Sequence, residues 1–320
     1  MRARLLALLS LACALFAAPA AAQDYPNKPV RMIVPFPAGG GTDVLARVVA
    51  AKLRDKFGQP VTVENRSGAA GNIGAEAVFK APPDGATLLF TQPAPLAVNK
   101  ALYGKLSYEP EQFVPIALVS QQDIMLAVNP KVPAQNLQEL IAHAKANPGR
   151  LNFGSSGAGS APHLAAELFD AMAGVKMVHV PYKGAGESMA ATLGGQVDLT
   201  FFAFSTALRN ARAGKLRAIA VGGTKRNPQL PDVPSISELI PGYSATSWTA
   251  LVAPPGTPAP VAQKLSQAMS EIIRMPDVQS RLIDAGDASF DMTPAQMAAF
   301  LREESQRWGS LIRTVGITAQ

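Results

Sequence analysis

The residues most able to do chemistry in this sequence are glycines, serines and threonines at the beginnings of predicted helices. The segment Gly39-Gly-Gly-Thr-Asp43 follows an apolar run, Val30–Val34, and precedes apolar residues with helical spacing. A glycine turn between a strand and a helix exposes backbone N–H groups, which together with the helix dipole bind anions. The segment contains neither of the glycine motifs that bind nucleotide phosphates. We therefore expect it to hold a carboxylate.

Three further turns combine glycine with a hydroxyl group or a cation. Ser67-Gly-Ala-Ala-Gly-Asn-Ile-Gly74 and Gly154-Ser-Ser-Gly-Ala-Gly-Ser160 each precede a predicted helix, and Tyr182-Lys-Gly-Ala-Gly186 adds the cation of Lys183. One such turn is common in α/β proteins, where glycine and serine reverse the chain. Several of them, without a phosphate-binding motif, predict a receptor for a small organic anion.

The sequence offers only weak candidates for catalysis. A serine hydrolase requires Gly-x-Ser-x-Gly between a strand and a helix, and Gly154-Ser-Ser-Gly-Ala158 ends in alanine instead. His163 and Glu167 have a spacing that suits a metal, but no third ligand accompanies them. His179 lies in an apolar strand and is expected to be packed. We therefore predict no enzyme activity, no metal and no cofactor; an exported hydrolase that uses Ser156 or His163 is the alternative from another class.

The N-terminus has the pattern of a secretory signal peptide. Arg2 and Arg4 precede an apolar run over 5–16, and small residues up to Ala22 provide a cleavage site. The apolar run is too short to cross a bilayer. We expect residues 1–22 to be removed near Ala22 during export across the inner membrane to the periplasm.

Composition narrows the function further. Cys13, the only cysteine, lies in the predicted signal peptide, so disulfides, thiol catalysis and cysteine metal sites are excluded from the mature chain. The formal net charge of +6 is spread along the sequence without a run of lysines or arginines, which argues against nucleic acid. The remaining length is sufficient for two domains held by their hydrophobic cores.

Strand-like and helix-like segments alternate along most of the sequence, which predicts an α/β fold with parallel sheets covered by helices. We expect Thr257 to cap a helix that has Pro258 at its first position, and Thr293-Pro-Ala-Gln296 to form a capping box. The predicted strands cover 30–34, 61–64, 87–91, 116–118, 124–128, 151–153, 176–180, 197–202, 217–221 and 249–253. The main predicted helices cover 43–57, 72–80, 137–146, 161–173, 188–193 and 294–313.

Several segments, spread over essentially the whole mature chain, match the motifs of one known family. They are Pro35-Phe-Pro-Ala-Gly-Gly-Gly-Thr-Asp43, Val63-Glu-Asn-Arg-Ser-Gly-Ala-Ala-Gly-Asn72, Pro82-Pro-Asp-Gly-Ala-Thr87, Phe153-Gly-Ser-Ser-Gly-Ala-Gly-Ser160, Val180-Pro-Tyr-Lys-Gly184, Gly194-Gly-Gln-Val-Asp-Leu199, Ala213-Gly-Lys-Leu-Arg-Ala218, Leu230-Pro-Asp-Val-Pro234 and Pro255-Gly-Thr-Pro258. In these segments the chain resembles the Bug (TctC) family, the solute receptors of tripartite tricarboxylate transporters.

The resemblance implies a two-lobed periplasmic-binding-protein fold, the type II Venus flytrap, with two crossover strands. The crossovers are expected near 120–123 and 245–248. Domain 1 is then discontinuous, 23–122 plus 247–320, and domain 2 covers 123–246. This arrangement would return the C-terminal helices to the first domain.

The resemblance also implies a ligand site in the cleft between the lobes, where backbone N–H groups and water hold the carboxylate. The expected ligand is a mono- or dicarboxylate, aromatic ones included. The expected partners are the permease subunits of a tripartite transporter, and the receptor is expected to be a monomer. We add His163, at the start of a predicted helix, and Phe204 or Phe202 as an apolar wall. The binding residues implied by the resemblance are Phe36, Gly40, Gly41, Thr42, Asp43, Ser155, Ser156, Gly157, Ser160, Tyr182, Lys183 and Gly184.

Two departures from the usual family pattern affect the expected ligand. Glu187 stands where proline is common, and the segment Thr200-Phe-Phe-Ala-Phe204 lacks the acidic residue that would pair with a ligand ammonium group. We therefore do not expect an amino acid as the ligand. A receptor that signals to a membrane sensor, instead of feeding a permease, is the alternative that keeps the same fold.

Overall fold

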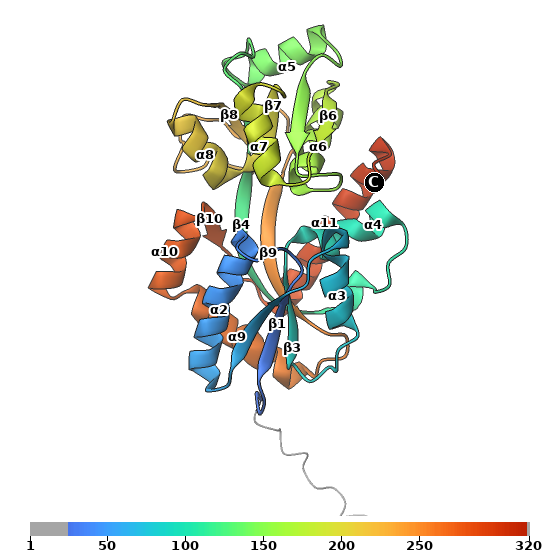
Figure 1. The fold of residues 1–320 in the computed structure, drawn as a ribbon, viewed down its shortest axis with the longest axis vertical. Coiled ribbons are helices and arrows are strands. Elements are labelled where there is room, and N and C mark those ends of the chain that lie inside the picture. Colours follow the sequence, from blue (N-terminus) through green and yellow to red (C-terminus); the bar gives the residue numbers. More distant parts are fainter. Residues whose placement is uncertain (1–24, 319–320) are drawn as a thin grey trace, which may run out of the picture.

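The computed structural model describes residues 25–318 and folds them into two α/β lobes joined by two crossover segments (Figure 1). The α/β class predicted from the sequence is thereby confirmed. The predicted signal peptide lies outside the described residues. Within the described part of the chain, no helix is both long and apolar enough to cross a membrane.

The first lobe is built on a mixed sheet with the strand order β2-β1-β3-β9-β4, extended at its edge by β10. β1 (Val30–Val34) lies between β2 (Val61–Asn65) and β3 (Thr87–Thr91), and these three strands run parallel. β9 (Thr246–Ala253) and β10 (Asp287–Ser289) run antiparallel to their neighbours. One face of the sheet is covered by α2 (Gly41–Phe57), α9 (Ala259–Ile273) and α10 (Pro276–Asp284), and the other by α3 (Asn72–Phe79), α4 (Asn99–Tyr103) and α11 (Pro294–Val315).

The second lobe repeats this plan. β5 (Asn152–Ser155) lies between β6 (Val178–Pro181) and β7 (Leu199–Ala203), all parallel. β4 (Val114–Val128) pairs antiparallel with β7 and with β8 (Arg217–Val221). One face is covered by α5 (Leu137–Ala146) and α6 (Ala161–Ala173), and the other by α7 (Ala185–Gly194) and α8 (Phe204–Arg212). Short irregular helices occur at Ala69–Gly71, Ala94–Val98, Pro110–Gln112 and Ile236–Glu238.

β4 belongs to both sheets and is the first crossover between the lobes (Figure 1). It pairs with β9 as far as Asp123 and with β7 over 124–128. The prediction of two short strands, 116–118 and 124–128, is wrong because the polar residues between them are paired as well; Gln122, for example, faces Asp287 of β10. We propose that the boundary between the two domains lies at this point of β4, where the sequence predicted it between residues 122 and 123.

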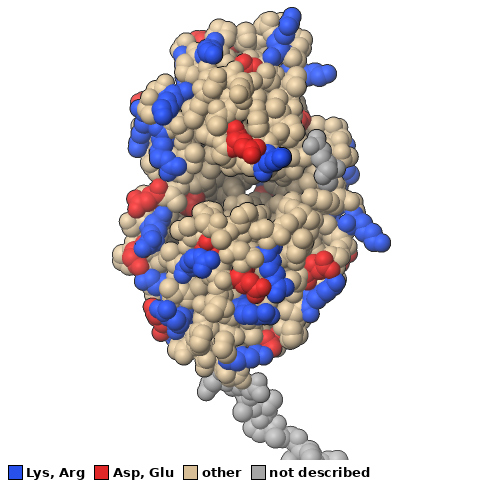
Figure 2. Space-filling model, in the orientation of Figure 1, with Lys and Arg blue, Asp and Glu red and all other residues tan. Residues whose placement is uncertain are grey.

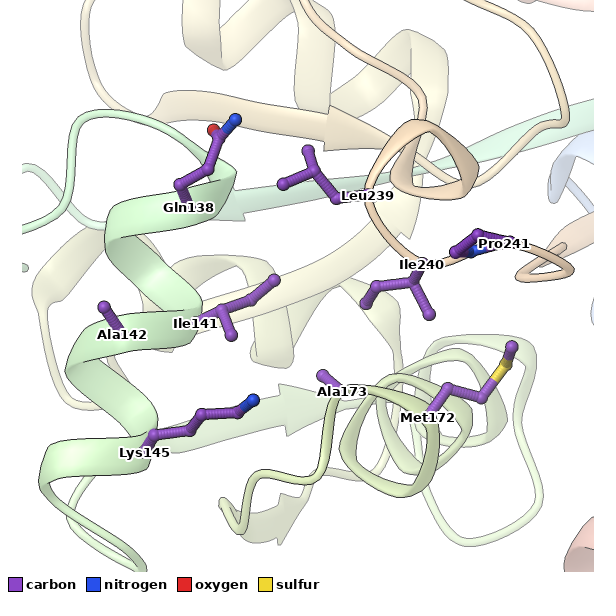
Figure 3. Close-up of a pocket in the computed structure, with 9 residues that line it drawn as sticks. All are labelled: Gln138, Ile141, Ala142, Lys145, Met172, Ala173, Leu239, Ile240 and Pro241. Carbon is purple, nitrogen blue, oxygen red and sulfur yellow. The ribbon is translucent and has the colours of Figure 1, made fainter.

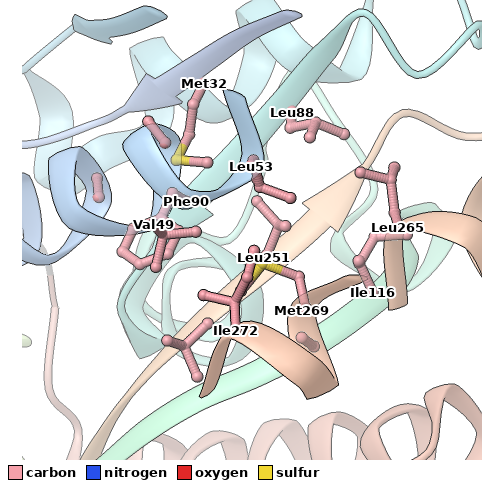
Figure 4. Packing of buried hydrophobic residues seen from close by; sticks show 14 of the residues in the cluster. Met32, Val49, Leu53, Leu88, Phe90, Ile116, Leu251, Leu265, Met269 and Ile272 are labelled. Carbon is pink, nitrogen blue, oxygen red and sulfur yellow. The ribbon is translucent and has the colours of Figure 1, made fainter. Parts of the chain in front are cut away.

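A hydrophobic core fixes the first sheet to α2 and α9 (Figure 4). Met32 and Phe90 from the sheet, Leu53 from α2, and Leu265 and Met269 from α9 are completely buried in it. Burial of one such side chain stabilises a fold by about 1.5–3 kcal/mol. The core therefore holds the end of β1, and the glycine turn that follows it, in a fixed position.

The predicted helix starts are partly correct. The capping box of Thr293 and Gln296 at α11 is confirmed. Thr257 does not cap α9, because its hydroxyl donates to the carbonyl of Pro254 (2.8 Å) and Pro258 occupies the N-cap position. The hydroxyl is thus used by the turn that precedes the helix.

A buried carboxylate fixes α11 to the second crossover strand. Glu304 accepts hydrogen bonds from the indole N–H groups of Trp248 in β9 (2.9 Å) and Trp308 in α11 (3.1 Å). Arg307 pairs with Glu304 and lies over the Trp308 ring. Removing the carboxylate would leave two buried donors without an acceptor.

We expect Glu304→Ala to lower the free energy of unfolding by about 2–4 kcal/mol, because both indole N–H groups lose their acceptor. Glu304→Gln should cost less, since the amide oxygen still accepts a hydrogen bond. Denaturant unfolding measures both changes. Glu303→Ala, at an exposed position of the same helix, is the matched control and should change stability by less than about 0.5 kcal/mol. Equal losses for Glu303→Ala and Glu304→Ala would contradict this role.

Candidate functional site

The glycine turns of both lobes lie at the ends of parallel strands. β1 leads into the turn before α2, and β5 leads into the turn before α6. In Figure 1 the first turn of α2 points toward the second lobe, and Figure 2 shows a hollow between the two lobes with charged side chains around it. Ligands of open α/β sheets bind outside the carboxyl ends of the strands. The hollow between the lobes is therefore the candidate site.

The first turn leaves the beginning of α2 uncovered. Gly40 is the N-cap residue, and no side chain caps the helix. Gly39, Gly40 and Gly41 are exposed, and a Cβ added at Gly41 would have no neighbour within 4 Å. The first N–H groups of an α-helix have no acceptor within the helix. They can bind an anion here, and the helix dipole adds to the attraction.

Asp43 braces this turn. Its carboxylate is 3% exposed and accepts hydrogen bonds from the Gly39 N–H (2.9 Å), the Asn65 amide (3.0 Å) and the Arg47 guanidinium (3.1 Å). These donors, Arg47 first, hold the pKa of Asp43 below its ordinary value. Asn65 also donates to the carbonyl of Phe36 (3.1 Å) and so ties β2 to the turn. The arrangement argues against direct contact between the Asp43 side chain and a ligand.

The other predicted residues of the first lobe lie at the same turn. Phe36 is half-buried, with its ring beside Gly71, and Thr42 is buried in the first turn of α2. Gly39, Gly40 and Gly41 are exposed, whereas Thr42 and Asp43 are buried. Backbone groups are therefore better placed than side chains to meet a ligand from this lobe.

In the second lobe, serine side chains fold the turn over residues 154–160 on itself. The Oγ of Ser155, which is buried, accepts a hydrogen bond from the Gly157 N–H (3.1 Å), and the Ser160 hydroxyl donates to the Gly157 carbonyl (2.7 Å). Ser160 is the N-cap residue of α6, but its side chain does not cap the helix. Ser156 is half-buried. This turn, like the first, leaves the start of a helix without a side-chain cap.

His163 lies behind this turn. Only 4% of it is exposed, its Nδ1 accepts a hydrogen bond from the Gly159 N–H (3.0 Å), and its Nε2 is 3.3 Å from the Glu167 carboxylate. With both nitrogens occupied and the ring buried, direct contact with a ligand is not favoured. Over residues 25–318, no group of three or more His, Cys, Asp or Glu side chains is placed to hold a metal ion.

The predicted turn at residues 182–186 lies beside the turn that precedes α6. Tyr182 donates its backbone N–H to the Ser155 carbonyl (3.0 Å), and Gly184 is the N-cap residue of α7, again without a side-chain cap. Lys183 is exposed, and its backbone N–H donates to the Glu187 carboxylate (3.2 Å). The residue that departs from the family pattern, Glu187, thus supports the turn that carries the cation.

The predicted apolar wall is not supported by the positions of its residues. Phe204 has no exposed surface; it begins α8 and packs in the core of the second lobe, against Gly286 of the first lobe. Phe202 is also buried in that core. Phe202 lies within β7 and Phe204 is the first residue of α8; the sequence indicated neither their burial nor the start of that helix.

Sequence reasoning also missed two supporting residues, Asn65 and His179. Asn65 is the last residue of β2, which lies next to β1 in the sheet. Its position at the end of a predicted neighbouring strand was the only signal in the sequence that it lies beside the turn. The His179 Nε2 lies 2.6 Å from the Ser155 hydroxyl. That contact joins residues of two different strands, β5 and β6, and no local pattern indicates it.

Two other depressions contain none of the predicted binding residues. A groove of about 760 Å³ lies on the second lobe between α5, the end of α6 and residues 239–241 (Figure 3). A second one, of about 690 Å³, lies beside the crossovers and is lined by residues such as Gln121, Thr246 and Asp287. Neither depression is formed by the glycine turns.

Two lobes, two crossovers and helix starts directed at the space between them define a solute-binding protein of the periplasmic type. Residues 45–317 match the family described as the tripartite tricarboxylate transporter family receptor. The chain belongs to this family, as the resemblance of its sequence motifs predicted. Its function is therefore that of a solute receptor for a transporter of this kind.

Individual relatives agree with this assignment. The chain is 39% identical to Protein BugT of Bordetella pertussis over 98% of both chains. Among solved structures, R. palustris Rpa4515 with adipate is 34% identical, with a TM-score of 0.82 over 92% of this chain and 100% of that chain. MatC from Rhodopseudomonas palustris with bound malate is 33% identical, with a TM-score of 0.78 over 90% and 100%. The expected two-lobed binding-protein fold is confirmed.

We expect Asp43→Ala to lower the free energy of unfolding by about 1–3 kcal/mol near neutral pH, because Gly39 and Asn65 lose a charged acceptor. The folded-state pKa of Asp43 is lowered. Its contribution is therefore present above the ordinary pKa of aspartate and is lost as the pH falls through the lowered value. Denaturant unfolding at several pH values measures this, with the exposed Asp55→Ala as control. A difference from wild type that stays constant into strong acid would contradict the interpretation.

Proposed function

We propose that this receptor binds a small mono- or dicarboxylate between its lobes, with one carboxylate group at the N-terminus of α2. The observation that carries the proposal is the uncovered start of that helix. Its glycines are exposed, no side chain caps it, and the space at Gly41 is empty of protein atoms. The dicarboxylates adipate and malate in the structures of two similar proteins support the same ligand class.

The second lobe offers matching groups. The N-cap residues of α6 and α7, Ser160 and Gly184, provide no side-chain caps, and Lys183 supplies an exposed cation beside them. Helix N-termini attract anions through their free N–H groups and their dipoles. A carboxylate at α2 and a second polar group at α6 or α7 would connect the two lobes through the ligand.

We further propose the cellular setting. Residues 1–22 are a signal peptide that directs export to the periplasm, where the receptor acts as a monomer. It then delivers its ligand to the permease subunits of the transporter in the membrane. The sequence pattern at the N-terminus and the receptor family support this setting.

A thermal-shift screen of mono-, di- and tricarboxylates identifies the ligand. A compound that binds only the folded state must raise the melting temperature, by mass action. We expect carboxylates to do so and uncharged analogues, such as the corresponding diols, to have no effect. If no carboxylate raises the melting temperature, the proposed ligand class is wrong.

Variants at the turns test the position of the carboxylate by titration calorimetry. Gly41→Val should abolish measurable binding, because its side chain fills the space of the anion while the fold has room for it. Thr42→Ala should cost about 0.5–1.5 kcal/mol of binding free energy, the size of one hydrogen bond. Lys183→Met should give a loss between these two.

Gly194→Val is the matched control for Gly41→Val. Gly194 is also an exposed helical glycine with no neighbour near an added Cβ, but it lies at the far end of α7. We expect it to bind as wild type does. Wild-type affinity in folded Gly41→Val would show that the carboxylate is held elsewhere.

A further inference from the structure

Two histidine rings lie stacked behind the glycine and serine turn of the second lobe. The ring centroids of His163 in α6 and His179 in β6 are 3.8 Å apart, and Phe153 stacks on His179 at 5.0 Å. Each imidazole contacts the turn: His163 Nδ1 accepts from Gly159, and His179 Nε2 lies 2.6 Å from the hydroxyl of Ser155. The turn that begins α6 is therefore held at two points by imidazole groups.

The hydrogen bond from Gly159 fixes the protonation of His163. Nδ1 must be without a proton to accept this bond, so the single proton of the neutral ring is on Nε2, which lies 3.3 Å from the Glu167 carboxylate. A second proton can bind only at Nδ1, where it would face the Gly159 N–H. Protonation of His163 and the hydrogen bond from Gly159 therefore exclude each other.

Gly159 also lies at a close contact between the two lobes. Its φ is +73°, and an added Cβ would lie 2.2 Å from a methyl carbon of Leu102 in α4 of the first lobe. One turn further along α6, Leu164 is buried in the same hydrophobic cluster as Leu102 and Trp308. A displacement of Gly159 would thus affect both the anion turn and the contact between the lobes.

We propose that His163 is a positioning residue of the ligand site: its neutral imidazole holds Gly159 and the start of α6 in the binding geometry, and acidification weakens ligand binding by breaking that hydrogen bond. The inference rests on the proposed function, because it takes the start of α6 to be part of the carboxylate site. Protonation of His163 removes the net negative charge of the His163–Glu167 pair, which by itself would favour an anion. We expect the loss of the Gly159 hydrogen bond, which displaces the start of α6, to outweigh this electrostatic gain.

Two titratable groups contact His163, and a third, Asp170, lies near one of them, Glu167; all three enter the design of the test. Glu167 lies on the same helix, and His179 stacks on the ring from β6. Burial, and next the neighbouring His163, lower the pKa of His179 to about 4, so that ring stays neutral at the pH values of the test. Burial raises the pKa of Asp170, which accepts from the Met177 N–H (2.7 Å), to about 7. Asp170 therefore changes charge in the same range and needs its own control.

The test measures affinity by titration calorimetry between about pH 8 and about pH 5.5, where histidine is the side chain most able to change charge. Adipate is the probe. We expect wild type to bind roughly tenfold more weakly at the acid end, the size of losing one hydrogen bond. His163→Asn places an amide oxygen near the position of Nδ1 and cannot be protonated. It should restore most of the affinity that His163→Ala loses, and its affinity should not follow the wild-type pH profile.

Controls separate His163 from other causes. Protonation of the probe is common to all variants and cancels when they are compared at one pH. His143→Gln, on α5 away from the turn, and Asp170→Asn should both keep the wild-type profile. The proposal is overturned if His163→Asn keeps that profile, if Asp170→Asn alone removes it, or if wild type binds more tightly on acidification.

A second measurement needs no ligand. In ¹⁵N-labelled receptor, the amide resonance of Gly159 should titrate together with the ring nitrogens of His163, and should be insensitive to pH in His163→Asn. If no carboxylate binds wild type, the proposed function fails, while this titration still decides the role of His163. If the Gly159 amide resonance does not change when His163 is titrated, the positioning role is contradicted, whether or not carboxylates bind.

Discussion

The hydrogen-bonded contact between the two crossovers is the interaction on which the rest of the structure depends. β4 and β9 pair along the first lobe as far as Asp123 and Thr246. Just beyond, Gly222 donates to the carbonyl of Ile124 (2.7 Å) and accepts from the N–H of Ala245 (2.8 Å). A Cβ at Gly222 would lie 2.4 Å from the Ala245 carbonyl oxygen, so only glycine fits there. These hydrogen bonds hold the two crossovers together and fix the hinge axis between the lobes.

With that axis fixed, each lobe brings helix N-termini to the space between them, and fixed charges play a smaller part. At the α2 turn the guanidinium of Arg47 is bonded by Asp43, which also takes the Gly39 N–H. The local cation is thereby neutralised by a group that is itself part of the scaffold. Attraction for an anion is left to the N–H groups and dipole of the helix. Such donors are held rigidly by the backbone and need no reorganisation when the ligand arrives.

Local patterns predicted the elements that are decided locally. The strands 30–34, 87–91 and 217–221 and the helices 137–146 and 161–173 have the bounds expected from the sequence. Apolar runs, caps and breakers lie within these segments themselves, and the motif match supplied the two-lobed fold. Predictions failed where long-range strand pairing determines the structure. The middle of β4 is a strand because it pairs with residues more than a hundred positions away in the sequence.

The candidate site divides in the same way. The glycine turns were readable because glycine next to a helix start has a local meaning. The functions of side chains around them were not, since they depend on neighbours from other strands. The hydrogen bond from Asn65 holds the Asp43 carboxylate away from the hollow. Stacking with His179 holds the His163 ring behind its turn. Phe204, the first residue of α8, packs in the core of the second lobe. Residue type indicated what these side chains can do, but only the fold indicates what they face.

The distribution of helix starts between the lobes bears on which ligands can close the receptor. A ligand shifts the balance between open and closed states only by the difference in its affinity for them. A carboxylate held by α2 alone would bind both states about equally and would not favour closure. A ligand with a second polar group that reaches α6 or α7 gains contacts only when the lobes approach. Leu164 of α6 shares a hydrophobic cluster with Leu102 of the first lobe, and Gly159, just before α6, passes close to Leu102. We therefore infer that the distance between the starts of α2 and α6 chiefly determines which ligand length fits. This favours dicarboxylates over monocarboxylates.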